Sequence, residues 1–181
     1  CRFCKDVLPE KPLLKLFNMP ESAQNFPTKF TLTNDKGIDL EIYQCKSCGL
    51  VQLAIEPVPY YRDVIRAAAF SQEMREFRLK QFKYFVDRYN LPGKKVIEIG
   101  CGKGEYLELM NQSGALAFGL EHLLESVEFC KQKGLKVERG FIESSSYKLQ
   151  NSPFDAFFVL NFLEHIPDMN SFLKGIANNL H

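Results

Sequence analysis

Four cysteines arranged as two close pairs are the residues of this chain best suited to hold a metal ion. Cys1 and Cys4 are separated by two residues, and so are Cys45 and Cys48. A pair at this spacing can turn both thiolates toward one centre, and two pairs complete the tetrahedral sulfur shell that Zn²⁺ prefers. Four protein ligands leave no open position for water or substrate, so we expect a structural zinc ion. Free or disulfide-bonded cysteines are the alternative.

A glycine-rich stretch has the pattern of a cofactor-binding turn. Gly100, Gly102 and Gly104 follow an apolar run over residues 95–99 and precede a helical pattern over residues 105–112. Glycine permits a sharp turn and lets a ligand approach closely, and the N-terminus of the next helix can hold a carboxylate. Glycine loops alone are weak evidence, and a turn of purely structural use is the alternative.

Glu121 makes the glycine turn more informative. It ends a second apolar run about 20 residues after Gly100, where a carboxylate can accept hydrogen bonds from both ribose hydroxyls of an adenosyl ligand. Dinucleotide sites usually have the spacing G-x-G-x-x-G, which cradles a pyrophosphate, whereas this chain has G-x-G-x-G. The pattern therefore favours an adenosyl cofactor without phosphate. An NAD(P)-dependent oxidoreductase is the alternative.

Two polar side chains follow a near-continuous apolar run over residues 154–161. Asn161 closes that run, and His165 comes shortly after it. In open α/β sheets the carboxyl ends of the strands border the ligand crevice, so we expect both residues to face cofactor or substrate. His165 is the candidate here for an acid, a base or a hydrogen-bond donor. Capping of the following helix is its alternative role.

The elements that must position these residues alternate between strand and helix. An amphipathic helix over residues 71–90 leads into this part of the chain, with Ser71 as its expected N-cap. Alternation of this kind predicts βαβ units and a doubly wound parallel sheet. The expected strands are 95–99, 115–120, 135–138 and 154–161, and the expected helices are 105–112, 124–133 and 170–180. We expect the strand over 154–161 to be buried on both faces.

The first part of the chain has the composition of a small, turn-rich module. Short apolar runs at residues 30–32 and 40–43 predict strands, and several prolines separate them. Such a module is too small to depend on its own core, so a metal would stabilise it. Cys101 and Cys130 lie outside the two cysteine pairs and are interpreted as small apolar residues.

Charge and hydropathy exclude several classes of partner. The 23 basic and 22 acidic residues give a net charge of +1 and lack the clustered positive field that a nucleic-acid partner requires. No stretch approaches the roughly 20 apolar residues that span a bilayer, and no signal segment opens the chain. We expect a cytoplasmic protein with no nucleic-acid or membrane partner. A non-enzymatic zinc-ribbon binding module remains the alternative to an enzyme.

The motifs resemble those of a known family. Residues 98–104 resemble motif I of class I S-adenosylmethionine-dependent methyltransferases, and residues 163–168 are similar to the segment after their fourth strand. The cysteine pairs, with Gly49-Leu-Val-Gln52 after the second, resemble the zinc-binding domain of sugar C-methyltransferases that act on nucleotide-linked keto-deoxysugars. The resemblance implies an α/β fold: a Rossmann-like class I methyltransferase sheet, truncated after strand 4 and its helix, preceded by a small zinc-binding β-rich domain.

The resemblance also implies roles for individual residues. His165 matches a histidine that the relatives present to substrate, and it is the expected catalytic residue. Phe141 and Ile142 would lie near the adenine, and Asn161 at the methionine end of the cofactor. The expected cofactor-binding residues are Gly100, Cys101, Gly102, Gly104, Glu121, His122, Phe141, Ile142 and Asn161. The expected metal ligands are Cys1, Cys4, Cys45 and Cys48.

The function that the resemblance implies is methyl transfer from S-adenosylmethionine to a small polar acceptor. The acceptor would be a sugar or nucleotide-linked sugar, with C-methylation favoured over O-methylation, and structural Zn²⁺ would be the second cofactor. The expected domains are a zinc-binding domain over 1–59, a linker and amphipathic helix over 60–90, and an incomplete cofactor domain over 91–181. The catalytic base would lie beyond residue 181. We expect a monomer or a homodimer, since an unfinished sheet exposes an edge strand.

Overall fold

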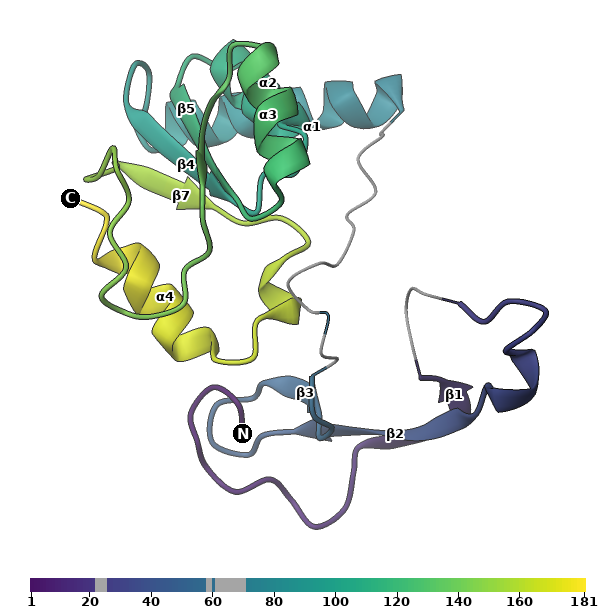
Figure 1. Ribbon diagram of the computed structural model, residues 1–181. Helices are drawn as coiled ribbons and strands as arrows, with labels where there is room; N and C mark the ends of the chain where they lie inside the picture. Colours follow the sequence, from purple (N-terminus) through teal and green to yellow (C-terminus); the bar gives the residue numbers. More distant parts are fainter. Residues whose placement is uncertain (22–25, 58–59, 61–70) are drawn as a thin grey trace. The chain divides into compact units, whose positions relative to one another are not determined.

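The computed structural model describes residues 1–21, 26–57, 60 and 71–181 (Figure 1). The chain divides into two compact units, and each is described here by itself. Most of the predicted linker, residues 61–70, lies outside the described residues, as do residues 58 and 59 of the predicted zinc-binding domain.

The N-terminal unit is built on a three-stranded antiparallel sheet in the order β1-β2-β3. Its strands are β1 (Leu14–Pro20), β2 (Gly37–Gln44) and β3 (Val51–Leu53). β2 contains the run over 40–43 that predicted a strand. β1 was not predicted from the sequence.

The prediction of a strand at residues 30–32 is wrong. Leu32–Asn34 form a 3-10 turn, η1. The side chain of Thr31 accepts a hydrogen bond from the Thr28 amide at 2.9 Å, and the Thr28 carbonyl accepts one from the Leu32 amide. Threonine side chains that bond to nearby backbone offer the chain a turn in place of a sheet ladder, and here the turn prevails.

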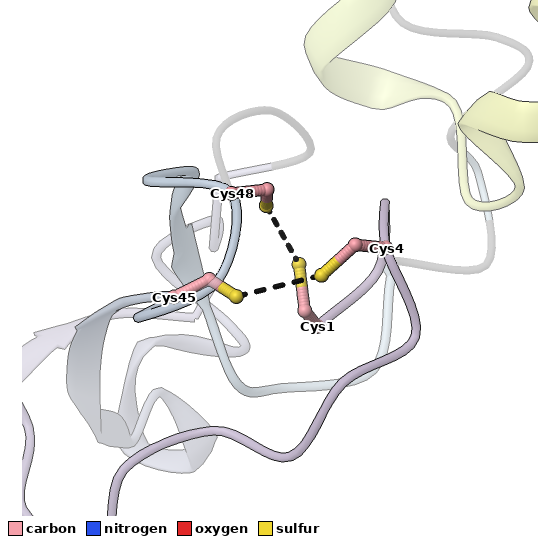
Figure 2. A group of neighbouring side chains, drawn as sticks. All are labelled: Cys1, Cys4, Cys45 and Cys48. Carbon is pink, nitrogen blue, oxygen red and sulfur yellow. Dashed lines mark hydrogen bonds between the residues drawn. The ribbon is translucent and has the colours of Figure 1, made fainter.

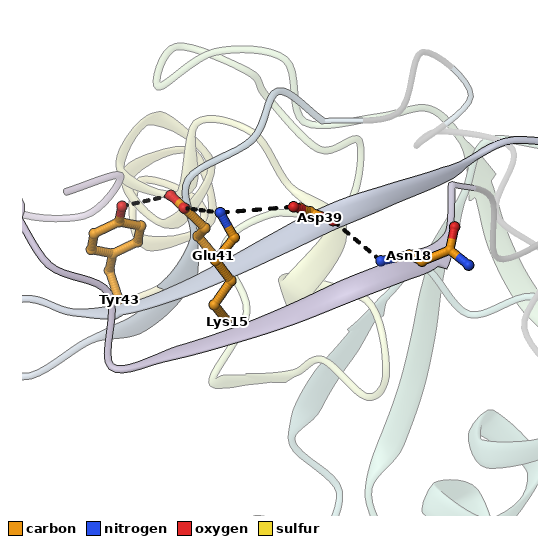
Figure 3. Close-up of polar contacts among 5 residues, drawn as sticks. All are labelled: Lys15, Asn18, Asp39, Glu41 and Tyr43. Atoms are coloured by element: carbon orange, nitrogen blue, oxygen red, sulfur yellow. Dashed lines mark hydrogen bonds and ion pairs between the residues drawn. The ribbon is translucent and has the colours of Figure 1, made fainter.

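One face of this sheet is polar (Figure 3). Lys15 on β1 lies with its Nζ 3.1 Å from Glu41 Oε1 and 3.7 Å from Asp39 Oδ2 on β2. The Tyr43 hydroxyl donates to Glu41 Oε2 at 2.7 Å, and this bond, with the Lys15 ammonium, lowers the pKa of Glu41. These groups are solvent-exposed, so they contribute little to stability and mainly hold the register of the two strands.

The C-terminal unit confirms the predicted fold class. Its four strands are all parallel, in the order β6-β5-β4-β7. The strands are β4 (Lys95–Ile99), β5 (Leu116–Glu121), β6 (Lys136–Arg139) and β7 (Ala156–Phe158), and the helices are α1 (Gln72–Arg88), α2 (Glu105–Gln112), α3 (Leu124–Gln132) and α4 (Met169–Ala177). Every predicted helix is present, within a few residues of its expected ends.

Helices cover both faces of this sheet (Figure 1). On one face, α1, α2 and α3 enclose a core that includes Val86, Leu107 and Val127. On the other face, Phe172 and Ile176 of α4 pack into a second core with residues of β4 and β5. The result is the three-layer arrangement that a doubly wound sheet requires, because each buried face of a sheet needs a covering layer.

The predicted amphipathic helix begins as expected but buries less than its pattern indicates. The Ser71 side chain accepts a hydrogen bond from the Met74 amide at 3.1 Å, which caps α1. Only Phe82 and Val86 are buried, whereas Met74 and Phe77 are exposed. The apolar period therefore marks a core-facing side only in the second half of the helix.

The fourth strand is shorter than predicted. The expected run over 154–161 forms a ladder only at Ala156–Phe158, and all three of these residues are half-buried, not buried on both faces. Phe154 forms an isolated bridge with Leu180 in place of pairing with β4. Within the described residues β7 pairs with β4 alone, and Asn161 has a φ of +52°, which no strand permits.

Candidate functional site

The order of the strands places the ligand crevice. From β4 the chain moves outward through β5 to β6 on one side, and then returns to the other side of β4 with β7. In open α/β sheets the crevice lies at such a switch point, outside the carboxyl ends of the two strands. The glycine turn follows β4, and Asn161 comes soon after β7. The sheet thus brings both predicted segments to one edge.

The glycine turn has the backbone that only glycine adopts without strain. Gly100, Gly102 and Gly104 have φ values of +76°, +55° and +79°. Its amides already donate within the chain: those of Gly100 and Cys101 to the Leu120 carbonyl, and that of Gly104 to the Cys101 carbonyl. These amides therefore stabilise the turn itself, and binding of a ligand carboxylate by the N-terminus of α2 stays a prediction.

Glu121 is joined directly to the glycine turn. Its Oε2 accepts a hydrogen bond from the Gly102 amide at 2.8 Å, and its Oε1 accepts one from the Leu123 amide at 2.8 Å. The residue is 9% exposed, so the carboxylate is fixed at the end of β5. Each carboxylate oxygen keeps a second lone pair, so both can still accept a ligand hydroxyl.

Two of the three glycines make room for the protein's own side chains. A Cβ placed on Gly100 would lie 2.7 Å from Cδ2 of the Phe162 ring. A Cβ on Gly104 would lie 2.5 Å from Leu135 Cδ1 and 3.0 Å from Cys130 Sγ. A side chain at either position would thus meet the protein's own packing, and the close approach of a ligand to these glycines stays a prediction.

A row of aromatic rings runs along the carboxyl ends of the strands. His122 after β5 and Phe141 after β6 have ring centroids 6.1 Å apart. Phe141 lies 6.1 Å from Phe162, which in turn lies 6.1 Å from Phe172 of α4. The row joins the predicted residues His122 and Phe141. Phe162 was not predicted, although an aromatic residue directly after Asn161 was the signal for it.

Ile142 and Cys101 lie in the protein core. Ile142 is 3% exposed and packs against Gly175 of α4, where a Cβ would come within 2.5 Å of it. Cys101 is fully buried, and its Sγ would be 2.5 Å from a Cβ on Gly119. Both residues follow a strand end, as predicted, and their side chains are buried. The burial of Cys101 and Cys130 confirms their interpretation as small apolar residues, and contact of Cys101 or Ile142 with a cofactor stays a prediction.

Two buried carboxylates lie near the glycine turn. Glu98 in β4 is fully buried beside Gly119 of β5 and Phe158 of β7 in the sheet register. Hydrogen bonding with Cys130, burial, and the charges of Glu98 and Glu121 raise the pKa of the Cys101 thiol well above its ordinary value. Glu98 is the first residue of the motif over residues 98–104, but it was not predicted as a site residue. A charged residue inside an apolar strand was the available signal.

His165 lies in a 3-10 turn, η3 (Leu163–His165), between β7 and α4. Its Nε2 is 3.9 Å from Glu164 Oε1, and its amide donates to the Phe162 carbonyl at 3.1 Å. The residue is half-buried. It precedes the first residue of α4, Met169, by more than a cap position, so the alternative role of helix capping does not apply.

The four paired cysteines converge on one centre (Figure 2). All four sulfurs lie within 4.8 Å of one another, with Cys1 and Cys48 at 3.7 Å and Cys4 and Cys45 at 3.5 Å. Tetrahedral thiolates about 2.3 Å from a zinc ion would be about 3.8 Å apart. The donor set and its spacing therefore fit zinc. Within the described part of the chain, no other group of His, Cys, Asp and Glu residues comes together in this way.

The two cysteine pairs share one backbone geometry. The Lys5 amide donates to the Cys1 carbonyl at 3.0 Å, and the Gly49 amide donates to the Cys45 carbonyl at 2.9 Å. The amides of Cys48 and Ser47 also point toward the Cys45 sulfur and lower its pKa to about 7. A thiol with a lowered pKa gives up its proton to a metal more readily.

Comparison with known proteins agrees with the fold and with the class of enzyme. The family model described as "Methionine biosynthesis protein MetW" matches residues 80–176. A curated ubiquinone biosynthesis O-methyltransferase from Haemophilus ducreyi is 32% identical over 105 residues, which are 52% of this chain and 44% of that protein. Its counterpart from Pseudomonas fluorescens is 34% identical over 101 residues, 49% of this chain and 40% of that protein. The chain thus spans less than half the length of these relatives.

A solved structure shows the same fold. The plantazolicin methyltransferase BpumL, in complex with a monoazolic desmethylPZN analog and SAH, matches with a TM-score of 0.50. The two chains are 16% identical, and the match covers 61% of this chain and 45% of BpumL. The described helices include none with the length and hydropathy needed to traverse a bilayer.

Proposed function

The chain belongs to the family of the methionine biosynthesis protein MetW, and on this premise we propose that it is an S-adenosylmethionine-dependent methyltransferase. The observation that carries the proposal is the bond between the Gly102 amide and the Glu121 carboxylate at the switch point of the sheet. It joins the turn after one strand to the acid at the end of the next. An adenosyl ligand would use both.

Glu121 would hold the ribose. Its two oxygens each accept one backbone amide and each retain an acceptor position, so they match two neighbouring hydroxyl donors. His122 and Phe141 stand beside it at the ends of β5 and β6, where their rings can border an adenine. Asn161, at the end of the segment after β7, would lie toward the methionine end.

The spacing of the turn favours a methyltransferase over an NAD(P)-dependent oxidoreductase. Dinucleotide sites usually have the spacing G-x-G-x-x-G, which cradles a pyrophosphate, whereas this turn has G-x-G-x-G. S-adenosylmethionine has no phosphate that would need such a cradle.

We propose a small polar acceptor, and a nucleotide-linked keto-sugar as its class. Bound S-adenosylmethionine would supply a methyl group on a positively charged sulfur. His165 lies in η3 between β7 and α4, and it would take part as an acid, a base or a hydrogen-bond donor toward the acceptor. In C-methylation the acceptor loses a proton from the carbon beside its ketone.

O-methylation is the second candidate, and the names of the curated relatives favour it. The acceptor would then lose a hydroxyl proton. Incubating the intact protein with S-adenosylmethionine and either a nucleotide-linked keto-sugar or a small hydroxyl-bearing acceptor separates the two, since magnetic resonance tells a C-methyl from an O-methyl product. His165→Asn should lower turnover with either acceptor. Unchanged turnover would remove His165 from the mechanism.

We also propose that Cys1, Cys4, Cys45 and Cys48 hold a structural Zn²⁺. Among the described residues of the N-terminal unit, only Cys45 and Gln52 are buried, so the unit has almost no apolar core. A metal that links its first residues to the turn before β3 would supply the missing constraint. No disulfide joins any of the six cysteines, which fits a reducing compartment, and we place the protein in the cytoplasm as a monomer or homodimer.

Calorimetry on the intact protein tests the enzyme assignment. We expect wild type to bind S-adenosylhomocysteine, and Glu121→Gln to bind it at least tenfold more weakly, because two charge-assisted hydrogen bonds to the ribose become neutral. Glu128→Gln is the matched control, since Glu128 is an exposed acid on α3.

Two other results would overturn the proposal. Binding of NAD(H) without binding of S-adenosylhomocysteine would favour the oxidoreductase. Binding of neither NAD(H) nor S-adenosylhomocysteine, together with retardation of a polyanion in a gel, would favour the zinc-ribbon binding module.

A further inference from the structure

Phe162 lies against the glycine turn at the switch point of the sheet. It directly follows Asn161, which has a φ of +52°. The Phe162 ring then lies on the glycine turn, with Cδ2 and Cγ 2.7 and 2.9 Å from the place that a Cβ on Gly100 would take.

The ring is held from behind but is not fully covered. Phe141 and Phe172 flank it at centroid distances of 6.1 Å. Phe162 belongs to the half-buried residues packed against the core beside α4. Aromatic neighbours at these distances fix the orientation of the Phe162 ring, because the ring could rotate only if the neighbouring rings moved with it. Phe162 is therefore a half-buried ring of fixed orientation beside the glycine turn.

The surroundings of this ring favour a cation. Aromatic rings carry negative charge on their faces, which attracts positive groups within about 6 Å. The Glu121 carboxylate accepts a hydrogen bond from the Gly102 amide of the same turn at 2.8 Å. A positive ligand group at this turn would thus lie near both an aromatic ring and a carboxylate.

We infer that Phe162 contacts the sulfonium of S-adenosylmethionine and makes the site prefer this substrate over the product S-adenosylhomocysteine. The inference rests on the proposed function. Substrate and product share the adenosine and the amino acid, and they differ in one methyl group and one positive charge at sulfur. A residue that recognises the charge separates the two, whereas a residue that recognises the shared parts does not. Phe162 is therefore a specificity-determining residue that favours release of the product.

The test is the ratio of two dissociation constants, measured by calorimetry on the intact protein. We expect Phe162→Leu to weaken binding of S-adenosylmethionine about two- to fivefold more than binding of S-adenosylhomocysteine, because leucine fills similar volume without a ring quadrupole. Phe162→Tyr keeps the ring and should keep the wild-type ratio. Phe77→Leu is the matched control, since Phe77 is exposed on α1. Phe162→Met replaces the leucine variant if that variant does not fold.

The outcomes separate this inference from the proposed function. If wild type binds neither compound, the proposed function fails. If wild type binds both and Phe162→Leu weakens them equally, the methyltransferase assignment stands and the role of Phe162 is only structural. A changed ratio in Phe162→Tyr would also overturn the inference, because that variant retains the aromatic face.

Discussion

The ring of Phe162 fills the space that a side chain at Gly100 would need, with its Cδ2 2.7 Å from the ideal Cβ position. Gly100 also has a φ of +76°, a backbone conformation that strains any residue with a Cβ. A side chain at Gly100 would therefore cost free energy twice, once through backbone strain and once through the clash with Phe162. A second glycine of the chain, which has the positive φ but no such neighbour, separates the two costs.

Gly100→Ala should destabilise the protein by about 2 to 4 kcal/mol, measured as the free energy of unfolding in urea. Gly134→Ala is the matched control, because Gly134 has a φ of +75° but no heavy atom within 4 Å of its Cβ position. It should cost only about 1 to 2 kcal/mol, the strain alone. Equal losses in the two variants would show that Phe162 yields to the new methyl group.

The intact protein should contain one zinc ion per chain by elemental analysis. Cys45→Ala should lose it, since Cys45 is the buried member of the four-cysteine centre, whereas Cys130→Ala should retain it. Removing zinc with a chelator should make four more thiols reactive to iodoacetamide and should unfold the N-terminal unit, because structural zinc contributes folding energy directly. A chelated protein with unchanged thermal stability would contradict a structural role.

Stability should fall at alkaline pH partly because of Tyr147. Burial, followed by the charges of Glu138 and Glu143, raises the pKa of this phenol above its ordinary value of 10.0. The unfolded chain therefore loses the proton first as pH rises. The stability that protonated Tyr147 contributes is fully present below about pH 10 and is lost as pH rises through the folded pKa.

Comparing Tyr147→Phe with wild type in urea checks this sign. The unfolding free energy of wild type should drop more steeply than that of the variant between about pH 9 and about pH 11. Tyr84→Phe, at an exposed position on α1, should follow wild type. Parallel curves for wild type and Tyr147→Phe would show that this phenol is not the group responsible.

The strands and helices of the C-terminal unit could be predicted because each has one dominant local signal. The run over 95–99 is apolar and is closed by Gly100, and β4 ends where the run ends. The run over 154–161 looked similar, but among the described residues β7 pairs only with β4. An apolar run does not show how many of its residues have a partner strand. The turn at Leu32–Asn34 was missed for a related reason, since threonine has both strand propensity and turn-forming side-chain bonds.

The metal centre was more predictable than the cofactor site. Two cysteines separated by two residues can turn both sulfurs toward one centre, so the spacing alone predicts the arrangement. The four sulfurs lie together as expected. At the cofactor site the residues lie at or after the strand ends, but the sequence did not predict where their side chains point, and their contacts with a cofactor stay a prediction. Ile142 and Cys101 face the core, and Phe162 fills the space beside Gly100. Such directions depend on packing across the sheet, which a motif of neighbouring residues does not contain.

The two walls of the crevice are attached to the sheet with unequal strength. β4 and β5 are in register along Lys95–Ile99, whereas β7 meets β4 only along Val96–Glu98. The strand that ends in Glu121 is therefore the more firmly paired one. The segment after β7, which contains Phe162 and His165, can open locally at lower free energy. Under the proposed function, the side with Glu121 would hold the cofactor in place, and the side with Phe162 and His165 would adapt to the acceptor.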